Sequence, residues 1–531
     1  MSDARKSALR ELKAQNKLPH VGIVGAGISG LRCADTLIRN GFQVTILEAR
    51  ERIGGRVSIV LVNFAVVLLR RGANWIHGTR NNPIALLASM TDADLVPDEP
   101  DAIFFDSVGE RIPANKADQC AELVADAFDK AIEHSKNLSS SIDSQRNVLD
   151  YVLEIVRRSP LDAESKNICE QMIHMYNSEI GDCIESQSLK YFHLEDGMDG
   201  HDAFVASTYK NIIQLISKTA RSADAIQLGQ EVVKVQTFSR NSDNKAVAVE
   251  LAGGQVKTFD EVVITCPLGW LKRHKSAFKP CLPPRLEQAI DSIGYGALEK
   301  VFVSFPTAFW QKEKDRGGAA SSTLVEREEA SRFIFWHFLS PSYHPLTKHL
   351  GSWTQEFVAL SGLPDAHAHP TLVFYVAPPC SRHLMPSFAG LAPHSDAYND
   401  ILRSFTEPFY SRMPNYDAAS PACRPTLFLG SQWQNDPFAG YGSYVSFQVG
   451  LERADEDLRI LRTGGGRGAT GGNLMGNDRG VWFAGEHTAP LCGLGTTTGA
   501  WWSGERAARD VLKVYGMKKD MNKDGIGPVI S

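Results

Sequence analysis

The sequence predicts an α/β fold in which a parallel sheet with helices adjoins a second part made of helices and mixed strands. Near the start, the apolar run His20–Val24 is followed at once by glycines and then by a segment with helical spacing of apolar residues. A second strand-like run, Phe42–Leu47, comes next, and this order is typical of a parallel sheet. Farther along, Ala117–Ala131 has helical patterning, while Lys300–Phe305 and Leu372–Val376 are strand-like.

The length, composition and charge limit the classes of protein to which the chain can belong. The chain has 531 residues, enough for about three or four domain-sized units. Hydrophobic residues at 43% and charged residues at 22% are ordinary for a soluble globular protein. The net charge of -5 and the pI of 6.3 argue against a nucleic-acid-binding protein, which is normally basic.

The cysteines and the two ends of the sequence indicate the cellular compartment in which we expect the protein. The cysteines are scattered without a CxxC pair, and their odd number, 9, fits a reduced intracellular protein with no metal site. The N-terminal segment lacks the apolar core of a secretory signal, and Val529–Ser531 is not a peroxisomal tripeptide. The most apolar run, Ser58–Leu69, is far shorter than the roughly 20 residues of a spanning helix. We therefore expect a cytoplasmic protein without a membrane segment.

The first chemical signal is a dinucleotide-binding turn between the first strand and the helix. Gly25 permits the tight turn, Gly27 lets a pyrophosphate approach the backbone, and Gly30 lets helix and strand pack closely. Glu48 ends the second strand, 48 − 30 = 18 residues after Gly30, where a carboxylate accepts hydrogen bonds from ribose hydroxyls. The motif predicts a Rossmann-like domain, and by itself it does not distinguish NAD from FAD.

The residues after Glu48 favour FAD. The run Glu48-Ala49-Arg50-Glu51-Arg52-Ile53-Gly54-Gly55-Arg56 resembles the E-A-R-x-R-x-G-G-R run of the flavin amine oxidases. The resemblance implies non-covalent FAD, with Glu48 and Arg50 at the adenosine side, and Gly55 and Arg56 at the pyrophosphate. Guanidinium groups are well suited to fixing phosphate oxygens.

The same resemblance extends from about Val21 to about Leu512. The matching segments, in order, are Gly229–Val235, Phe259–Gly269, Ile293–Val301, Trp433–Pro437, Gly442–Tyr444, Val481–Thr488 and Gly495–Gly504. In the family, the backbone at Val233 would meet the adenine, Glu486 the ribityl chain, and Thr496 and Thr497 the flavin. The further cofactor ligands that the resemblance implies are Ala73, Asn74, Trp75 and Gly485.

The resemblance also implies how the chain is divided. The FAD-binding domain would be discontinuous, formed by residues 19–89, 221–274 and 436–515. Residues 90–220 and 275–435 would form an α+β substrate-binding domain with a mixed sheet. We expect flexible tails at residues 1–18 and 516–531, and exposed loops at Gln311–Ser331 and Arg462–Gly480, which are rich in charged or small residues.

Within this family the chain is most similar to the fungal and animal polyamine oxidases. Such an enzyme oxidises a secondary amine of spermine, spermidine or their N-acetylated forms, with O2 as the second substrate. Lys300 would hold a water against flavin N5, and His77 in the W-I-H-G context would bind substrate. Tyr444 would supply an aromatic wall, with a cation–π contribution. Glu179 and Asp182 are candidates, by rough position, to pair with the remote ammonium.

Two other functions remain open. The first is a histone-lysine demethylase of the same superfamily, although we see neither a helical module before the glycine turn nor a long coiled-coil insertion. The second is a non-catalytic binding protein on the same scaffold, against which Lys300 and Gly485–Thr488 argue. A monoamine oxidase is disfavoured because no cysteine lies in that family's covalent flavin motif. The substrate bond that is cut and the oligomeric state are not predicted.

One segment departs from the family pattern. Between G-G-R and G-A-x-W the family has a hairpin with a glycine turn and a carboxylate near its end. Here Ser58–Leu69 has no glycine, and Arg70-Arg71 stands where the carboxylate is expected. An apolar edge hairpin of this kind is prone to aggregation. We therefore hypothesise that Ser58–Arg71 is misread, through a wrong splice boundary or a shifted frame; a genuine run would weaken FAD binding or stability.

Overall fold

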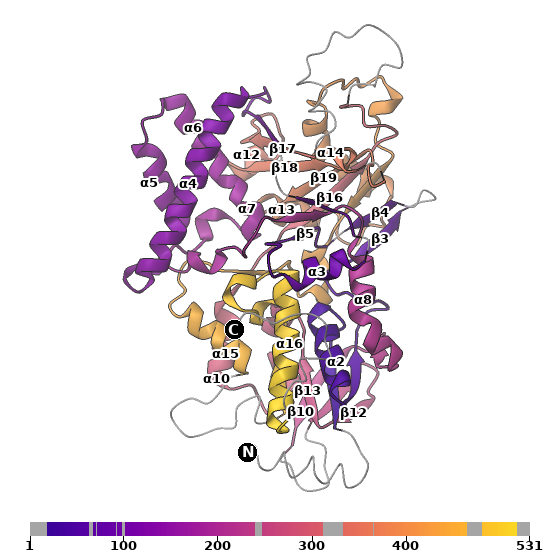
Figure 1. Cartoon of the computed structure of the whole chain (residues 1–531). Coiled ribbons are helices and arrows are strands. Elements are labelled where there is room, and N and C mark those ends of the chain that lie inside the picture. Colours follow the sequence, from indigo (N-terminus) through magenta and orange to yellow (C-terminus); the bar gives the residue numbers. More distant parts are fainter. Residues whose placement is uncertain are drawn as a thin grey trace.

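The computed structural model describes most of the chain, with gaps. The described residues are 19–62, 67–70, 72–91, 93–97, 101–238, 247–311, 333–364, 366–464 and 480–517. The predicted N-terminal tail, nearly all of the predicted C-terminal tail, and most of both predicted loops lie outside them. Figure 1 shows two regions, one around α2 and α16 and the other around β16–β19 and α4–α6.

The first region is built on a five-stranded parallel sheet. Every neighbouring pair of strands in it is parallel. The strands come from the start, the middle and the end of the chain, so distant segments meet at one sheet. Their order is β22 (Val481–Phe483), β13 (Glu261–Ile264), β1 (His20–Val24), β2 (Gln43–Leu47) and β9 (Ile226–Gln227).

Three helices cover one face of this sheet: α2 (Ile28–Arg39), α8 (Tyr209–Ser222) and α16 (Thr497–Val514). Helices α2 and α16 pack closely because glycine stands at their contact. A Cβ added at Gly504 would lie 2.1 Å from the backbone oxygen of Ser29. The guanidinium of the buried Arg32 lies 4.3 Å from the ring centre of Trp501, which ties the two helices further.

The opposite face packs on a second sheet and more helices. The four-stranded sheet has the order β12 (Val256–Phe259), β11 (Val247–Leu251), β10 (Val232–Thr237) and β14 (Phe278–Lys279). The helices are α9 (Leu268–Arg273), α10 (Pro284–Ser292) and α15 (Ala454–Thr463). The parallel sheet is therefore buried on both faces, as is usual for such sheets.

The second region contains a six-stranded mixed sheet. It is antiparallel except for the parallel pair β17 and β7. Its order is β20 (Leu427–Gly430), β16 (Glu299–Ser304), β19 (Thr371–Val376), β18 (Thr354–Ala359), β17 (Ile334–Leu339) and β7 (Asp101–Phe105). One face packs on α13 (Cys380–Ser387) and α14 (Asp396–Tyr410).

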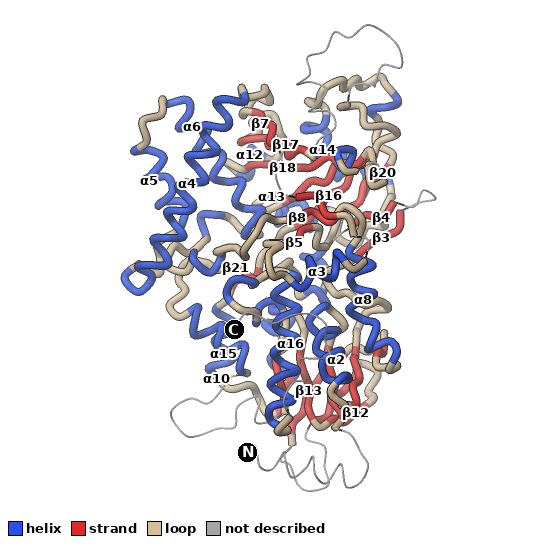
Figure 2. The backbone as a smooth tube through the Cα atoms, viewed as in Figure 1, coloured by secondary structure: helices blue, strands red, loops and turns tan. Residues whose placement is uncertain are grey.

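The other face of the mixed sheet meets a small three-stranded sheet of β5 (Trp75–Ile76), β8 (Ala203–Val205) and β6 (Leu95–Pro97). At the β7 end stand α4 (Ala114–Leu138), α5 (Val148–Arg158) and α6 (Ala163–Met172). Figure 2 shows these helices in blue beside the red strands. Further short elements are α3 (Pro83–Ser89), α7 (Asn177–Ile180), α12 (Thr347–Leu350), β15 (Gly294–Tyr295) and β21 (Val445–Ser446).

This architecture confirms the predicted fold class, with a glycine-turn parallel sheet and a separate mixed sheet. The strand predicted at Lys300–Phe305 is β16, and the helical pattern at Ala117–Ala131 lies within α4. The division at particular domain boundaries stays a prediction. In the part of the chain that the structure describes, no helix is both long and apolar enough to cross a membrane.

The apolar run forms a hairpin. Its strands β3 (Ile59–Val62) and β4 (Val67–Arg70) pair antiparallel, with Ile59 opposite Arg70 and Val62 opposite Val67. The hairpin projects at the right of Figure 1. At its base, a Cβ on Gly72 would lie 1.8 Å from the Arg56 carbonyl oxygen, so the two ends of the hairpin are in contact. The described residues of the run thus form two paired strands, as in the family hairpin between G-G-R and G-A-x-W, although their side chains depart from the family pattern.

Candidate active site

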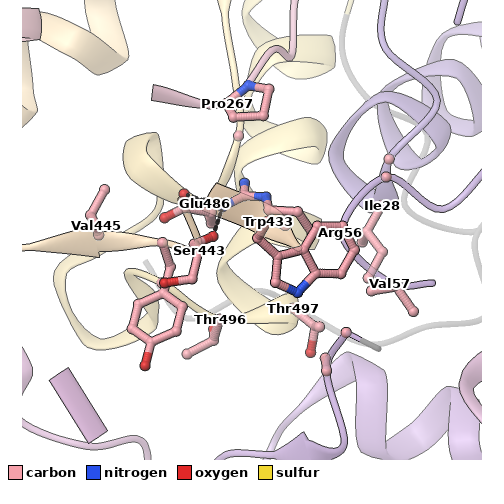
Figure 3. Close-up of a pocket in the computed structure, with 18 of the residues that line it drawn as sticks. Ile28, Arg56, Val57, Pro267, Trp433, Ser443, Val445, Glu486, Thr496 and Thr497 are labelled. Atoms are coloured by element: carbon pink, nitrogen blue, oxygen red, sulfur yellow. Dashed lines mark hydrogen bonds and ion pairs between the residues drawn. The ribbon is translucent and has the colours of Figure 1, made fainter. Parts of the chain in front are cut away.

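A cavity of about 520 Å³ runs from the glycine turn of the parallel sheet to the face of the mixed sheet. Its wall includes the predicted cofactor residues Gly25 and Gly27 in the turn between β1 and α2, Thr497 at the start of α16, and Lys300 on β16. Figure 3 shows part of the wall, with Arg56 and Glu486 next to each other and Trp433 and Thr497 nearby. One continuous cavity therefore joins the predicted cofactor site to the predicted catalytic residue.

The glycines of the turn have distinct roles. Gly25 has φ +106°, a conformation that favours glycine. A Cβ on Gly30 would lie 2.1 Å from the Gly25 oxygen, so helix and strand require glycine there. Nothing lies within 4 Å of a Cβ built on Gly27, which faces the cavity. Space is thus left at the position where a pyrophosphate would approach the N-terminus of α2.

Glu48 and Arg50 lie at the end of β2. The Glu48 carboxylate accepts hydrogen bonds from the backbone N–H groups of Ala26, at 2.8 Å, and Arg50, at 2.9 Å. It therefore fixes the glycine turn against the second strand, and Glu48 also lines the cavity. The Arg50 guanidinium is held by Asp436 at 2.6 Å and lies 5.4 Å from the Phe438 ring centre. This contact joins the E-A-R run to the W-Q-N-D-P segment.

Arg56 is fixed by three groups. It donates to the Glu486 carboxylate at 3.0 Å, to the Tyr295 hydroxyl at 3.2 Å and to the Ser443 carbonyl. Burial would lower the pKa of Arg56, but the charges of Tyr295 and Glu486 and the hydrogen bond to Glu486 outweigh it and raise that pKa. Arg56 is thus a permanent positive charge on the cavity wall.

Among the residues that the structure describes, two buried acceptors on the wall have no hydrogen-bond partner: Glu486 Oε2 and Asn74 Oδ1. A buried acceptor without a partner costs free energy, so such atoms indicate an absent donor. The hydroxyl and N–H groups of FAD are donors of this kind. Together with the open Gly27 and the cationic Arg56, these residues fit the cofactor.

The N-terminus of α16 closes this part of the cavity. The Thr496 hydroxyl accepts from the Gly499 N–H at 2.9 Å, which caps the helix. The Thr497 hydroxyl lies 3.3 Å from the Tyr209 hydroxyl, and both threonines line the cavity with Gly485, Gly55 and Ala73. The helix therefore presents its positive end to the place where the flavin is expected.

Lys300, Trp75 and Tyr375 form the centre of the site. The buried Lys300 Nζ donates to the Gly72 carbonyl at 2.6 Å and lies 5.1 Å from the Tyr375 ring centre. The Trp75 indole donates to the Tyr375 hydroxyl at 3.0 Å, and its ring stacks on Phe335. Lys300 is thus part of the cavity wall, not a solvated strand lysine.

His77 is oriented by neighbours on two sides. Its Nδ1 lies 2.6 Å from Asp202 Oδ2, while Asp202 Oδ1 accepts from the Gly78 N–H at 2.8 Å. The Asn82 amide donates to the carbonyls of His77 and Gly78 at 3.0 and 2.7 Å. Burial would raise the pKa of Asp202, but its hydrogen bond with His77 prevails and that pKa is lowered. The ionised Asp202 therefore fixes the orientation of the His77 ring, and with it the direction of the second ring nitrogen, Nε2.

Several carboxylates line the same cavity as Lys300. Burial raises the pKa of Glu179, and it raises the pKa of Glu195 to about 7. The Tyr444 hydroxyl donates to the backbone oxygens of Ser178 and Glu179 at 3.1 and 3.0 Å, which fixes this wall. Our sequence reasoning missed Glu195, Asp202 and Glu356, which also line the cavity. The acidic stretch Glu195–Asp202 was the available signal for the first two.

Three predicted site residues do not line the cavity: Gly30, which instead packs against the Gly25 backbone oxygen, Asp182 and Val233. Asp182 instead forms an ion pair with Arg382 at 2.8 Å. Val233 lies at a bulge of β10 with 40% of its surface exposed, and its neighbour Val232 lines the cavity. The alternation of a strand explains the one-residue difference, because consecutive side chains point to opposite faces. Among the described residues, no group of three or more His, Cys, Asp and Glu side chains forms a possible metal site.

The fold and the site define a class of protein that binds a dinucleotide cofactor beside a pocket lined by Lys300, aromatic rings and carboxylates. Residues 28–512 match the flavin-containing amine oxidoreductase family, and the chain belongs to that family. The cofactor of the family is a flavin, which confirms the prediction of FAD, held non-covalently as is typical of these proteins. Oxidation of amines is accordingly the chemistry for which the family is named.

The chain is similar to several curated relatives. It is 26% identical over 510 residues to lysine-specific histone demethylase 1 homolog 2 of Oryza sativa, covering 94% of this chain and 58% of the relative. It is 29% identical over 329 residues to probable polyamine oxidase 4 of Arabidopsis thaliana, covering 59% and 63%. The corticosteroid-binding protein of Candida albicans is 25% identical, covering 94% and 97%. The chain thus spans about three fifths of the first two relatives.

Among solved structures, putrescine oxidase has the same fold. A single-residue mutant from a redesign of its cofactor binding gives a TM-score of 0.65 at 19% identity, covering 93% of this chain and 99% of the other. Wild-type putrescine oxidase bound to putrescine gives 0.64 at 19% identity, with the same coverage of 93% and 99%. Identity this low shows the shared fold alone.

Proposed function

We propose that the chain is an FAD-dependent polyamine oxidase. It oxidises a secondary amine of spermine, spermidine or an N-acetylated polyamine, and the resulting imine is hydrolysed to an aldehyde and an amine. The observation that carries the proposal is the cavity itself. It places Lys300 and the rings of Trp75 and Tyr375 among the carboxylates of Glu179, Glu195 and Glu356. A flexible polycation is the amine that such a lining suits.

The chemistry needs the cofactor and a neutral amine at the carbon that reacts. Bound FAD supplies a hydride acceptor at N5 and returns the electrons to O2, which becomes hydrogen peroxide. The aromatic walls disfavour the charged form of an amine lying between them, because desolvation opposes charge. Lys300, fixed by the Gly72 carbonyl, holds a water at the reacting centre. His77, oriented by Asp202, binds the substrate at the edge of the site.

The remaining ammonium groups of a polyamine stay charged and pair with carboxylates. The charges of Glu179 and Glu195 both act on Tyr444, and the charge of Glu179 contributes to the raised pKa of Glu195. A bound cation would relieve this repulsion and lower both pKa values. Substrate binding should therefore strengthen as pH rises through 7, because Glu195 then binds the cation in its ionised form.

A second candidate is oxidation of a methylated lysine. Its support is the similarity to the Oryza demethylase homologue over 94% of this chain. A lysine side chain carries one charge where a polyamine carries several, so the extra carboxylates favour the polyamine. A third candidate is a binding protein without catalytic activity, because the Candida relative is named as a corticosteroid-binding protein. The buried Lys300 on the cavity wall argues against it.

A substrate panel tests the proposal. Purified holoenzyme is incubated with spermine, spermidine, their N-acetyl forms and a dimethyl-lysine peptide of histone H3, and peroxide and products are followed by fluorescence and mass spectrometry. We expect peroxide and an aminoaldehyde from at least one polyamine. Peroxide from the peptide alone would establish the demethylase activity instead. A yellow protein that gives no peroxide with any amine would contradict both oxidase proposals and favour the binding protein without catalytic activity.

A further inference from the structure

Tyr375 lines the cavity with only part of the hydrogen-bonding capacity of its hydroxyl in use. It is on β19, directly opposite Lys300 on β16, and both residues belong to the cavity wall. A phenol has one hydrogen to donate and two lone pairs that accept. The Trp75 indole donates to the phenol oxygen at 3.0 Å. The Tyr375 oxygen is therefore an acceptor toward Trp75, and its own hydrogen needs a different partner.

Within the described ranges, the structure shows no acceptor for that hydrogen, although the side chain is buried. The Asn74 side chain also hydrogen-bonds to the phenol, and this bond acts to lower the Tyr375 pKa, as a donor to its oxygen does. Both neighbours thus give hydrogens to the oxygen, and neither accepts one from it. A buried donor without an acceptor costs free energy, so a ligand that brings an acceptor is favoured.

The phenol keeps its hydrogen at neutral pH. Burial is the largest cause that raises the Tyr375 pKa well above its usual value of 10, and the charges of Glu356 and Glu179 raise that pKa further. The hydrogen bonds from Trp75 and Asn74 act in the opposite direction and do not prevail. Tyr375 is therefore a neutral hydrogen-bond donor, not a phenolate that would attract a cation.

The Trp75 indole is held in place by three neighbours. Its ring packs edge-on against Phe204, at 5.1 Å and 76°, and stacks on Phe335, at 6.0 Å and 20°. The Tyr209 hydroxyl donates to the Trp75 carbonyl at 2.7 Å. The indole N–H thus has a fixed direction. It restricts the rotation of the Tyr375 O–H bond, because the hydroxyl hydrogen points away from a donor that approaches the oxygen.

A carbonyl oxygen is the acceptor that suits this wall. It carries partial negative charge, and the Lys300 ammonium lies 5.1 Å from the centre of the Tyr375 ring. A carbonyl oxygen beside the phenol would therefore have both a hydrogen-bond donor and a cation near it. An ammonium group has no lone pair, so it cannot accept the Tyr375 hydrogen. The amide of an acylated polyamine has such an oxygen, whereas the charged groups of a free polyamine have none.

We propose that Tyr375 is a specificity-determining residue that donates its hydroxyl hydrogen to a carbonyl oxygen of the substrate, with Trp75 as its positioning residue. The inference rests on the proposed function and narrows it. The substrate class becomes amines that carry an amide group as well as the amine that is oxidised. A site with a fixed donor discriminates against an analogue of the same shape without the acceptor, because the donor is then left unpaired.

The test compares each N-acetylspermidine with an alkyl analogue of the same length. In N-hexylbutane-1,4-diamine and N-heptylpropane-1,3-diamine, a propyl group replaces the acetamide of N1-acetylspermidine and N8-acetylspermidine, and both amines are kept. We expect Tyr375→Phe to lower the ratio of kcat/KM for the acetyl compound to that for its analogue at least about tenfold in one pair. Tyr441→Phe, at an exposed tyrosine that is not on the cavity wall, is the matched control and should keep the ratio. Unchanged ratios in both pairs, in a yellow Tyr375→Phe protein, would overturn the inference.

The role of Trp75 is tested with the same ratio. Trp75→Phe keeps a ring and removes the indole N–H, so the ratio should fall by a smaller factor than in Tyr375→Phe. In the Tyr375→Phe background the same substitution should leave the ratio unchanged, because the hydroxyl that it orients is gone. A general loosening of the site would instead lower the rates for the acetyl compound and its analogue alike, and would contradict a positioning role.

The outcome is separable from that of the proposed function. If wild-type holoenzyme oxidises no polyamine, the oxidase proposal fails, and calorimetric titration of the same two pairs into the wild type and Tyr375→Phe still decides the inference. A ratio of affinities that falls about tenfold in one pair supports it. Ratios that stay unchanged, or no binding of either acetylspermidine to the wild type, overturn it. If Tyr375→Phe does not retain FAD, the ratio in Trp75→Phe decides, with the same outcomes.

Discussion

Lys300 is held from two sides, and this explains how a lysine can be buried at the centre of a cavity. Its ammonium donates to the Gly72 carbonyl, and the Tyr375 ring lies beneath it. Its backbone N–H donates to the Ser431 hydroxyl at 2.8 Å. The position of the ammonium is thus determined by the base of the hairpin and by two neighbouring strands of the mixed sheet.

Replacing Lys300 with methionine should separate cofactor binding from turnover. Methionine keeps an unbranched chain and loses the ammonium, so we expect FAD to remain bound and turnover to fall about 10²-fold. Flavin absorbance and steady-state kinetics measure the two effects. Lys234→Met, on the exposed β10 pair, is the control. Wild-type turnover in Lys300→Met would remove this residue from the mechanism.

Glu299 gives a prediction about pH. It is fully buried beside Lys300, and it accepts hydrogen bonds from the Ser431 hydroxyl and from the Gln434 N–H, the latter at 2.8 Å. Burial raises its pKa to about 7. Between its unfolded pKa and about 7 the folded protein binds the extra proton, so this group's contribution to stability falls as pH rises through that window.

The substitution Glu299→Gln mimics the protonated form and should remove this dependence. We expect the variant and the wild type to have similar Tm values near pH 5, and the variant to be more stable by on the order of 3 kcal/mol at pH 8. Thermal unfolding across this pH range measures the difference. A difference that stays constant with pH would show that Glu299 does not titrate in this way.

At the scale of elements, two glycines of the strand–turn–helix unit have different roles. Gly30 is required for the packing of helix and strand, whereas we expect Gly27 to be required for cofactor binding. Gly30→Ala would place a Cβ 2.1 Å from a backbone oxygen, so we expect about 1–3 kcal/mol of destabilisation in the absence of FAD. Gly27→Ala meets no atom within 4 Å and should keep the wild-type Tm without FAD. Because its methyl group enters the pyrophosphate path, FAD affinity should fall at least about tenfold.

Thermal unfolding with and without FAD, together with fluorescence titration of FAD, measures both effects. The two variants are controls for each other, since each adds a single methyl group to the same turn. Equal losses of Tm in both variants would contradict the assignment of Gly27 to the cofactor. Unchanged FAD affinity in Gly27→Ala would contradict it too.

The hairpin of β3 and β4 links the unusual apolar run to the site. Its base holds Arg56 against Gly72, and the Gly72 carbonyl receives the Lys300 ammonium. A change in this hairpin should therefore affect Arg56 and Lys300 together. The hypothesis that Ser58–Arg71 is misread is tested by sequencing the transcript. A cDNA that encodes the run unchanged ends that hypothesis.

At the scale of the whole molecule, local motifs in the sequence located residues that the structure brings to one cavity wall. The glycine turn, Glu48 and Arg56, and the strand of Lys300 follow from short segments, because each requires particular residues at fixed spacings. The site around Lys300 depends instead on long-range pairing. Strand register alone puts Tyr375 opposite Lys300 and Glu356 opposite Tyr375, and no local pattern marks these two residues. Asp182 was predicted as a site residue from its rough position in the sequence. It instead forms an ion pair with Arg382, which is distant in the sequence, and does not line the cavity.

The central claim is that one cavity brings FAD and a polyamine together, and anaerobic reduction of the flavin tests it most directly. Purified holoenzyme is mixed with spermine, spermidine and their N-acetyl forms without oxygen, and the flavin absorbance is followed. We predict that at least one polyamine bleaches the yellow colour and that admission of air restores it with release of hydrogen peroxide. A flavin that stays oxidised with every polyamine would contradict the account.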